Sequence, residues 1–237
     1  MATMVEIESL CKRFGPITAV DNVSFQVERG EVLGFLGPNG AGKSTTMKMV
    51  TGFLSPDSGR VRIGGDDIVS APIEAKSRIG YLPEGAPLYG DMTPAGLLDF
   101  IADIRGLRGA RKRARIDEVI DRVNLGGVLT QRTETLSKGF KRRVGLAQAI
   151  LHDPEVLILD EPTDGLDPNQ KHEVRSLIQE MAAEKVIILS THILEEVDAV
   201  CTRAVIIAGG KVLSDGTPEQ LLAHSQDHNA VKVTLIG

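Results

Sequence analysis

Apolar residues follow two different spacings along the chain, and the spacing changes near residues 89 and 152. Before residue 89, short apolar runs alternate with turns rich in glycine and proline, which is typical of β-strands. Between these two points the apolar residues recur at helical spacing, for example at Ile116, Val119 and Val123. After Asp153, apolar runs again alternate with helical segments, as in a parallel sheet. The pattern predicts an α/β core interrupted by a helical insert.

The flanking residues place the boundaries of this organisation. Residues 1–88 are expected to form the first part of the core, 89–152 a helical subdomain and 153–228 the second part of the core. Residues 229–237 are a short C-terminal extension, read either as the start of a truncated domain or as an edge strand. Strands are expected at Val5–Leu10, Val23–Val27, Glu31–Gly34, Arg60–Ile63, Arg78–Leu82, Val156–Asp160 and Val186–Ser190. Helices are expected at Lys43–Phe53, Ala95–Ile104, Arg115–Val123, Leu136–Leu151 and Pro218–His224.

Composition narrows the class of protein. The chain has 237 residues, 42% of them hydrophobic, which is enough for a sizeable core. Its net charge is −5 and it contains no tryptophan, so no nucleic-acid partner is expected. The basic run Arg108–Arg115 has no interleaved aromatic residues and is interpreted as a solvated helix face. No apolar run approaches the ~20 residues that a membrane-spanning helix needs.

A phosphate-binding loop is indicated by GPNGAGKS, residues 37–44. The segment follows an apolar strand and opens a helix, the context that makes the G-x-x-x-x-G-K-[ST] pattern specific. Glycines let the backbone wrap closely around phosphate, with N–H groups pointing inward. Lys43 would place its charge on the β- and γ-phosphates, and the Ser44 hydroxyl would bind Mg²⁺. The binding residues expected here are Gly37, Pro38, Asn39, Gly40, Ala41, Gly42, Lys43, Ser44 and Thr45.

Two carboxylates and a histidine complete the expected chemistry. Asp160 ends the apolar strand VLILD, where open α/β sheets bind their ligands, and would hold Mg²⁺. Glu161 follows directly and is the candidate general base for a water that attacks the γ-phosphate. His192 ends another apolar strand at the same edge, and could contact the γ-phosphate and orient the water and Glu161.

A second anion site is indicated by TETLSKGFKRRVGLAQAI, residues 133–150. Ser137 is a plausible N-cap, and basic residues crowd the first turns of the helix that follows. Free N–H groups at a helix N-terminus attract phosphate. The chain would thus contain two phosphate sites about 100 residues apart, which calls for an explanation.

Together these motifs resemble the nucleotide-binding subunit of an ATP-binding-cassette (ABC) transporter, over residues 4–225. The details YLPEGAPLY, LSKGF and EPTDGLDPNQ look most like the gliding-motility and multidrug exporter branch. The resemblance implies a P-loop NTPase core of mostly parallel sheet flanked by helices, an N-terminal antiparallel β part and an inserted α-helical subdomain. It also implies ATP and Mg²⁺ as cofactors, ATP hydrolysis coupled to export, and a separate transmembrane permease. The chain would be cytoplasmic, held at the inner face of the membrane through that permease.

The same resemblance answers the question of the two phosphate sites. In this family two subunits, identical or alike, pack head to tail when ATP is bound. Ser137 and Gly139 of one subunit would grip the γ-phosphate of the ATP that the other subunit's loop holds. Asp167 would help to link the two sites, and Phe14 would stack on adenine with Val20 alongside.

The sequence departs from the usual family pattern at four positions. Glu84 stands where glutamine is usual and would contact Mg²⁺ or mainly face the membrane partner. Lys138 and Phe140 alter the signature, and Asp164 replaces a small hydroxyl residue. A soluble ABC ATPase acting on DNA or ribosomes is the alternative. It is disfavoured because the insert is short, lacks sustained heptads and occurs in a single cassette.

Overall fold

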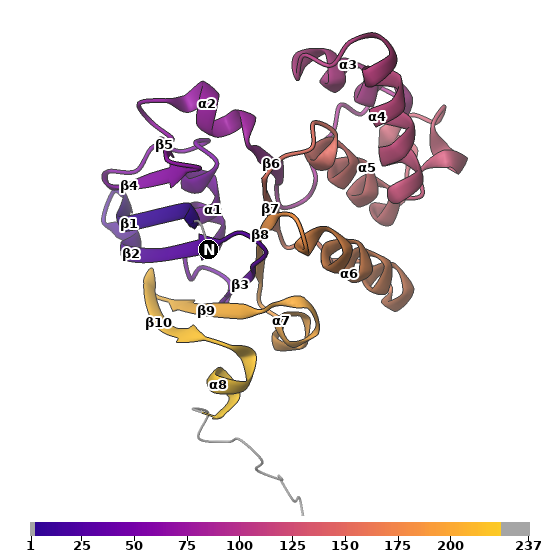
Figure 1. Ribbon diagram of the computed structural model, residues 1–237. Helices are drawn as coiled ribbons and strands as arrows, with labels where there is room; N and C mark the ends of the chain where they lie inside the picture. Colours follow the sequence, from indigo (N-terminus) through magenta and orange to yellow (C-terminus); the bar gives the residue numbers. More distant parts are fainter. Residues whose placement is uncertain (1–2, 224–237) are drawn as a thin grey trace, which may run out of the picture.

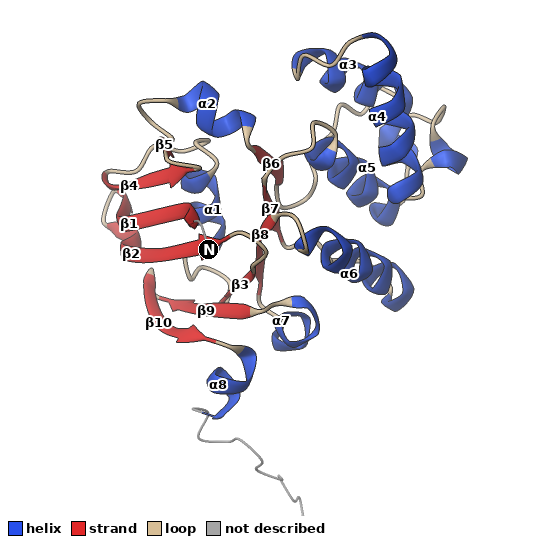
Figure 2. Cartoon of the chain, viewed as in Figure 1, coloured by secondary structure: helices blue, strands red, loops and turns tan. Residues whose placement is uncertain are grey.

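The computed structural model describes residues 3–223 as two β-sheets flanked by helices (Figures 1 and 2). The strands are β1 (Thr3–Phe14), β2 (Ile17–Glu28), β3 (Val32–Leu36), β4 (Ser58–Ile63), β5 (Asp66–Asp67), β6 (Ile79–Leu82), β7 (Val156–Asp160), β8 (Val186–Thr191), β9 (Arg203–Ala208) and β10 (Lys211–Gly216). The helices are α1 (Lys43–Val50), α2 (Pro72–Ser77), α3 (Pro94–Ile104), α4 (Gly109–Arg122), α5 (Lys138–Ile150), α6 (Pro168–Ala182), α7 (Leu194–Val200) and α8 (Pro218–Ala223). Two 3₁₀ turns lie at Gly126–Val128 and Thr133–Thr135.

The smaller sheet is antiparallel and has the order β2-β1-β4-β5. Its first two strands form a hairpin whose turn contains Gly15 at φ 57°, a conformation that favours glycine. Alternate residues of β1 and β2, such as Ile7 and Phe25, are buried against the core. This sheet covers one side of α1, which lies between the two sheets in Figure 1.

The larger sheet has the order β10-β9-β3-β8-β7-β6, and only β10 runs antiparallel to its neighbour. Its central strands are buried on both faces. In β7, Val156 and Ile158 face the cluster that contains α1, whereas Leu157 and Leu159 face the cluster of the other helices. Strand β8 divides its residues in the same way. Successive residues of a strand face opposite sides of the sheet, so a strand that is buried on both faces requires an unbroken apolar run.

The helical insert contains α3, α4 and α5 and packs onto the face of the sheet away from α1 (Figure 2). Helix α3 begins at an N-cap, Thr93, whose side chain accepts a hydrogen bond from the Gly96 N–H. Helix α5 is tied to the core where Gly145 passes Leu82 and Ala86, because a Cβ there would meet the Leu82 side chain at 2.8 Å. Ion pairs from Arg122 to Glu180 and from Arg143 to Glu173 connect the insert to α6.

The fold class expected from the sequence is confirmed, and the differences are local. The helix expected at Lys43–Phe53 ends at Val50, because Gly52 adopts φ 65° and turns the chain, which leaves Phe53 exposed. Helix α2 and strands β5, β9 and β10 were not predicted. Strand β10 has an exposed, mixed pattern with little apolar signal. The extension at 229–237, and His224 of the last expected helix, lie outside the described residues.

Among residues 3–223, no helix is both long enough and apolar enough to cross a bilayer.

The central position of β7 predicts a large stability effect at Leu157. Replacing this fully buried side chain by alanine removes packing on the helical face of the sheet. We expect Leu157→Ala to lower the free energy of unfolding by about 2–5 kcal/mol. Leu213→Ala is the control, since Leu213 is 65% exposed and should change it by less than about 0.5 kcal/mol. Urea unfolding of both variants measures the difference, and equal effects would contradict the central place of β7.

Candidate functional site

The predicted site residues converge at one edge of the larger sheet. Strands β3, β8 and β7 are adjacent and parallel, so their carboxyl ends lie side by side. The loop that begins at Gly37 follows β3, His192 follows β8, and Asp160 ends β7. Strand β8 therefore places the histidine between the glycine-rich loop and the carboxylates.

The glycine-rich loop packs tightly against its surroundings. A Cβ at Gly37 would lie 2.3 Å from the Ile207 carbonyl oxygen, and one at Gly42 would lie 2.4 Å from that of Ala19. Gly40 and Gly42 also have positive φ values, 79° and 105°. Helix α1 then starts without a side-chain cap and without an acidic residue in its first turn. Its first N–H groups and positive dipole end thus suit an anion.

Lys43 is buried, with only 5% of its surface exposed. Its Nζ donates to the Gly37 carbonyl oxygen at 2.7 Å and to that of Pro38 at 3.3 Å. It also lies 3.5 Å from Glu161 Oε1. A buried ammonium is tolerated only when it is compensated in this way. An incoming phosphate would therefore take over contacts that Lys43 makes with its own chain.

Asp160 is fully buried and has one carboxylate oxygen that is used and one that is not. Its Oδ1 accepts hydrogen bonds from the hydroxyls of Ser190 and, at 3.3 Å, of Ser44. Its Oδ2 is buried without a hydrogen-bond partner. An unpartnered buried carboxylate oxygen beside a serine hydroxyl fits the oxygen ligands that Mg²⁺ prefers. Ser44 and Asp160, predicted as metal ligands, are thus brought together.

Glu161 and His192 are in direct contact. The histidine Nδ1 lies 3.0 Å from Glu161 Oε2 and 3.2 Å from Oε1. A carboxylate oxygen accepts, so the tautomer that carries its proton on Nδ1 would donate to Glu161. Glu161 has the left-handed φ of 50°, rare for a non-glycine residue, and its N–H is held by the Ser190 carbonyl and hydroxyl oxygens. Its side chain is 11% exposed and that of His192 is 42% exposed, so the pair faces solvent on the imidazole side.

Glu84 lies outside this hydrogen-bonded cluster. Its side chain is exposed, and among the described residues it makes no hydrogen bond to Ser44 or Asp160. It remains electrically close to the site. Burial is the main cause that raises the pKa of the Tyr81 phenol, and the negative charges of Asp160 and Glu84 raise it further. Contact of Glu84 with Mg²⁺ stays a prediction.

Phe14 and Val20 have different surroundings. Phe14 is 49% exposed at the end of the β1–β2 hairpin, with the Lys12 ammonium over its ring at 5.8 Å from the centroid; its stacking on adenine stays a prediction. Val20 is fully buried, and a Cβ on Gly42 would lie 3.5 Å from its side chain. The buried Val20 side chain therefore packs against the glycine-rich loop, and its contact with adenine stays a prediction.

The second predicted anion site lies on the other side of the larger sheet. Ser137 is the N-cap of α5, and its Oγ accepts a hydrogen bond from the Phe140 N–H at 3.3 Å. Gly139 is buried, and a Cβ there would meet the Gln170 side chain at 2.5 Å. Figure 1 shows α5 and α1 on opposite faces of the sheet. The two predicted phosphate sites of one chain therefore belong to helices on opposite faces of the sheet.

The basic residues around Ser137 are mostly engaged within the chain. Lys141 donates to the Glu134 carbonyl oxygen, and Arg143 pairs with Glu173. Arg142 is buried, which lowers the pKa of its guanidinium. The stem of Lys138 lies near Gly165 in the loop before α6. An anion at this helix end would therefore be bound by backbone N–H groups and the Ser137 hydroxyl more than by free cations.

Asp167 is the N-cap of α6 and accepts a hydrogen bond from the Gln170 N–H at 3.0 Å. It is exposed at the end of the Asp164–Asp167 loop, where a partner could reach it.

The sequence analysis does not identify Ser190, whose hydroxyl donates to Asp160, as a site residue. Its signal was a hydroxyl residue at the end of an apolar run and two positions before His192.

Comparisons with known proteins agree with this geometry. A model of the ABC transporter family matches residues 20–164. The chain is 38% identical to the probable multidrug ABC transporter ATP-binding protein YbhF of Escherichia coli, over 94% of this chain but 39% of that protein's length. It is also 38% identical to the Nod factor export ATP-binding protein I of Paraburkholderia xenovorans, over 92% of this chain and 72% of that protein. A solved ATP-binding subunit of an ABC transporter superposes with a TM-score of 0.86 at 31% identity, covering 96% of this chain and 95% of that one. On the sequence match and the fold, the chain belongs to the ABC transporter family.

Proposed function

We propose that this chain is the ATP-binding and ATP-hydrolysing subunit of an exporter, driving a separate membrane permease. The carrying observation is the edge where β3, β8 and β7 end, which brings Lys43, Asp160, Glu161 and His192 together. The names of the Escherichia coli and Paraburkholderia relatives, a multidrug and an export protein, support the direction of transport.

Binding of ATP would be a task of the loop and the start of α1. The backbone N–H groups of residues 39–45 and the Lys43 ammonium would hold the β- and γ-phosphates, and Phe14 would stack on the adenine. Ser44 and Asp160 would hold Mg²⁺, with Glu84 as a further contact. When bound, the ion neutralises charge that develops on the phosphate oxygens.

Hydrolysis would be a task of Glu161 and His192. Glu161 would accept the proton of the attacking water, and His192, which bonds to that carboxylate, would fix its orientation. The Lys43 ammonium lies 3.5 Å from Glu161 Oε1, so a phosphate that takes over the lysine would free this carboxylate oxygen for the attacking water.

A head-to-tail dimer would explain the second phosphate site. Because α1 and α5 lie on opposite faces of the sheet, the loop before α1 and the helix end at Ser137 and Gly139 would each take a partner from a second chain. A second subunit could present its Ser137 to this chain's ATP. Asp167 lies exposed in the neighbouring loop and would take part in the same interface.

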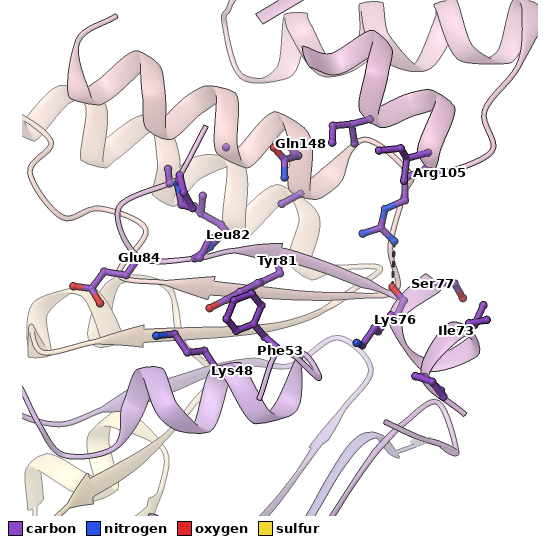
Figure 3. Close-up of a pocket in the computed structure, with 18 residues that line it drawn as sticks. Lys48, Phe53, Ile73, Lys76, Ser77, Tyr81, Leu82, Glu84, Arg105 and Gln148 are labelled. Carbon is purple, nitrogen blue, oxygen red and sulfur yellow. Dashed lines mark hydrogen bonds between the residues drawn. The ribbon is translucent and has the colours of Figure 1, made fainter. Parts of the chain in front are cut away.

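The permease would dock in a groove between the core and the helical insert (Figure 3). This groove has a volume of about 990 Å³. Three large apolar residues on its walls, Phe53, Ile73 and Ile104, are 78%, 80% and 63% exposed. Lys48, Lys76 and Arg105 lie along it, and Arg105 spans it by donating to the Lys76 carbonyl oxygen at 3.2 Å. An apolar segment with an acidic residue fits this lining.

The groove also has a wall that is electrostatically close to the nucleotide site. Tyr81 and Glu84 line it, and the negative charges of Asp160 and Glu84 add to the effect of burial in raising the pKa of Tyr81. A permease segment seated there would contact the loop that carries Glu84, so docking and hydrolysis would be coupled through one segment.

Glu161→Gln is expected to bind MgATP with unchanged affinity and to lose about 10²–10⁴-fold in turnover, since the general base is removed. Steady-state ATPase activity and titration with a fluorescent ATP analogue give the two values. Turnover close to that of the wild type would show that Glu161 is not the base.

Two inactive variants should restore each other if one ATP is shared by two chains. In a mixed dimer of Lys43→Ala and Ser137→Arg, one site carries both lesions and the other carries neither. We expect the equimolar mixture to exceed the mean activity of the separate variants. Cross-linking must show that mixed dimers form. A mixture whose activity stays at that mean would contradict the shared site.

Ile73→Glu should weaken docking of the permease and leave the ATPase activity of the isolated subunit unchanged. A charge on the groove wall opposes an apolar contact, whereas Leu213→Glu, a change at another exposed position (65% against 80% for Ile73), should have no effect. The measurement is the fraction of tagged protein that sediments with membranes of the native host. Equal retention of both variants would exclude this groove as the docking site.

A further inference from the structure

Glu196 is a buried carboxylate that the proposed chemistry does not use. It lies in the first turn of α7 and is only 3% exposed. Its Oε1 accepts hydrogen bonds from the Thr163 hydroxyl and, at 3.3 Å, from the Lys171 ammonium. Its Oε2 accepts one from the Thr191 hydroxyl at 2.8 Å. Both carboxylate oxygens are thus engaged.

The three donors come from three different segments, and each segment carries a residue of the site. Thr163 lies two residues after Glu161, in the turn that leads to the Asp164–Asp167 loop. Thr191 ends β8 directly before His192. Lys171 lies in the first turns of α6, and its N–H bonds to the carbonyl oxygen of Asp167, the N-cap of that helix.

Local hydrogen bonds couple the position of Thr163 to that of Glu161 and the position of Thr191 to that of His192. The Asp164 N–H donates to the Glu161 carbonyl oxygen, and the Leu166 N–H to that of Thr163. On the other side, the Thr191 hydroxyl oxygen also accepts from the Ile193 N–H at 3.1 Å, which fixes the turn around His192. A shift of Thr163 relative to Thr191 would therefore move Glu161 relative to His192.

The buried Glu196 carboxylate fixes the positions of its three donors relative to one another. A buried charge is costly unless it is paired and its lone pairs are satisfied, so the three donors have to stay in place together. Hydrogen bonds to a charged acceptor are short and directional, which fixes the donors relative to each other. The left-handed backbone of Glu161 needs such support, because strained residues persist only where their surroundings over-determine them.

We propose that Glu196 is a positioning residue for ATP hydrolysis. It holds the Thr163 and Thr191 segments together, keeps Glu161 and His192 in contact, and ties both to the loop at the proposed dimer interface through Lys171. This inference rests on the proposed roles of Glu161 and His192.

The test compares two carboxylates that are both anchored by ion pairs. Glu196→Gln removes the charge and turns one acceptor into a donor at nearly constant shape. Glu155→Gln is the control, since Glu155 pairs with Arg29 at 2.5 Å and Arg78 at 2.6 Å, just before the opposite end of β7. Thr163→Val removes one donor without changing the charge, and it decides the question if Glu196→Gln does not fold.

For each purified variant, kcat and KM of the ATPase, the affinity for a fluorescent ATP analogue and the urea unfolding curve are measured. We expect Glu196→Gln to lower kcat by about 10–100-fold, the range found when partners that orient functional side chains are removed. Thr163→Val should lower kcat by a smaller factor. Nucleotide affinity should stay within about twofold in both, because neither residue touches the phosphate-binding loop. Glu155→Gln should leave kcat unchanged.

Three results would overturn the proposal. One is a wild-type kcat in Glu196→Gln while Glu161→Gln is inactive; the proposed function would then stand without this residue. Another is a loss of kcat in Glu196→Gln matched by Glu155→Gln, or accompanied by an equal loss of nucleotide affinity, which shows a structural role alone. The third is full turnover in Glu161→Gln, which removes the proposed base and with it the function that Glu196 would serve.

Discussion

The parallel pairing of β3, β8 and β7 is the constraint on which the rest of the structure depends. In a parallel sheet all carboxyl ends point to one edge, and here that edge receives the glycine-rich loop, His192 and the Asp160-Glu161 pair. The pairing is maintained by strands that are apolar on both faces, which bury one set of residues against α1 and the other against α5, α6 and α7. Burial of these apolar residues offsets the free-energy cost of placing charged side chains at this edge.

The charges at this edge compensate one another within the chain. Lys43 lies against Glu161, Asp160 accepts from two serine hydroxyls, and Glu161 receives the imidazole of His192. Such a network is costly when half satisfied. Among residues 3–223, Asp160 Oδ2 has no hydrogen-bond partner and is buried close to Ser44, where a hard cation would complete it. The arrangement thus suits the Mg²⁺ and phosphate of the proposed function.

The layered packing also places the helices of the two expected phosphate sites, α1 and α5, on opposite faces of the larger sheet. The loop that would hold ATP leads into α1 on one face of the sheet, and Ser137 caps α5 on the other face. This placement of α1 and α5 is the physical basis of the proposed head-to-tail dimer, in which a second chain would supply the helix end at Ser137. The groove lined by Phe53, Ile73 and Tyr81 runs between the core and the helical insert and is where the proposed membrane partner would dock.

The sequence by itself determined the local chemistry. The spacing of Gly37–Ser44 predicts a phosphate loop, and the apolar run before Asp160 predicts a strand that delivers a carboxylate, because both signals depend only on neighbouring residues. Tertiary structure alone decided which distant segments meet. The position of β8 between β3 and β7, the burial of Val20 beneath Gly42, and the gathering of Thr163, Lys171 and Thr191 around Glu196 all arise from packing between residues far apart in the chain. No local pattern encodes such contacts, since they depend on how whole faces of the sheet and helices are buried against each other.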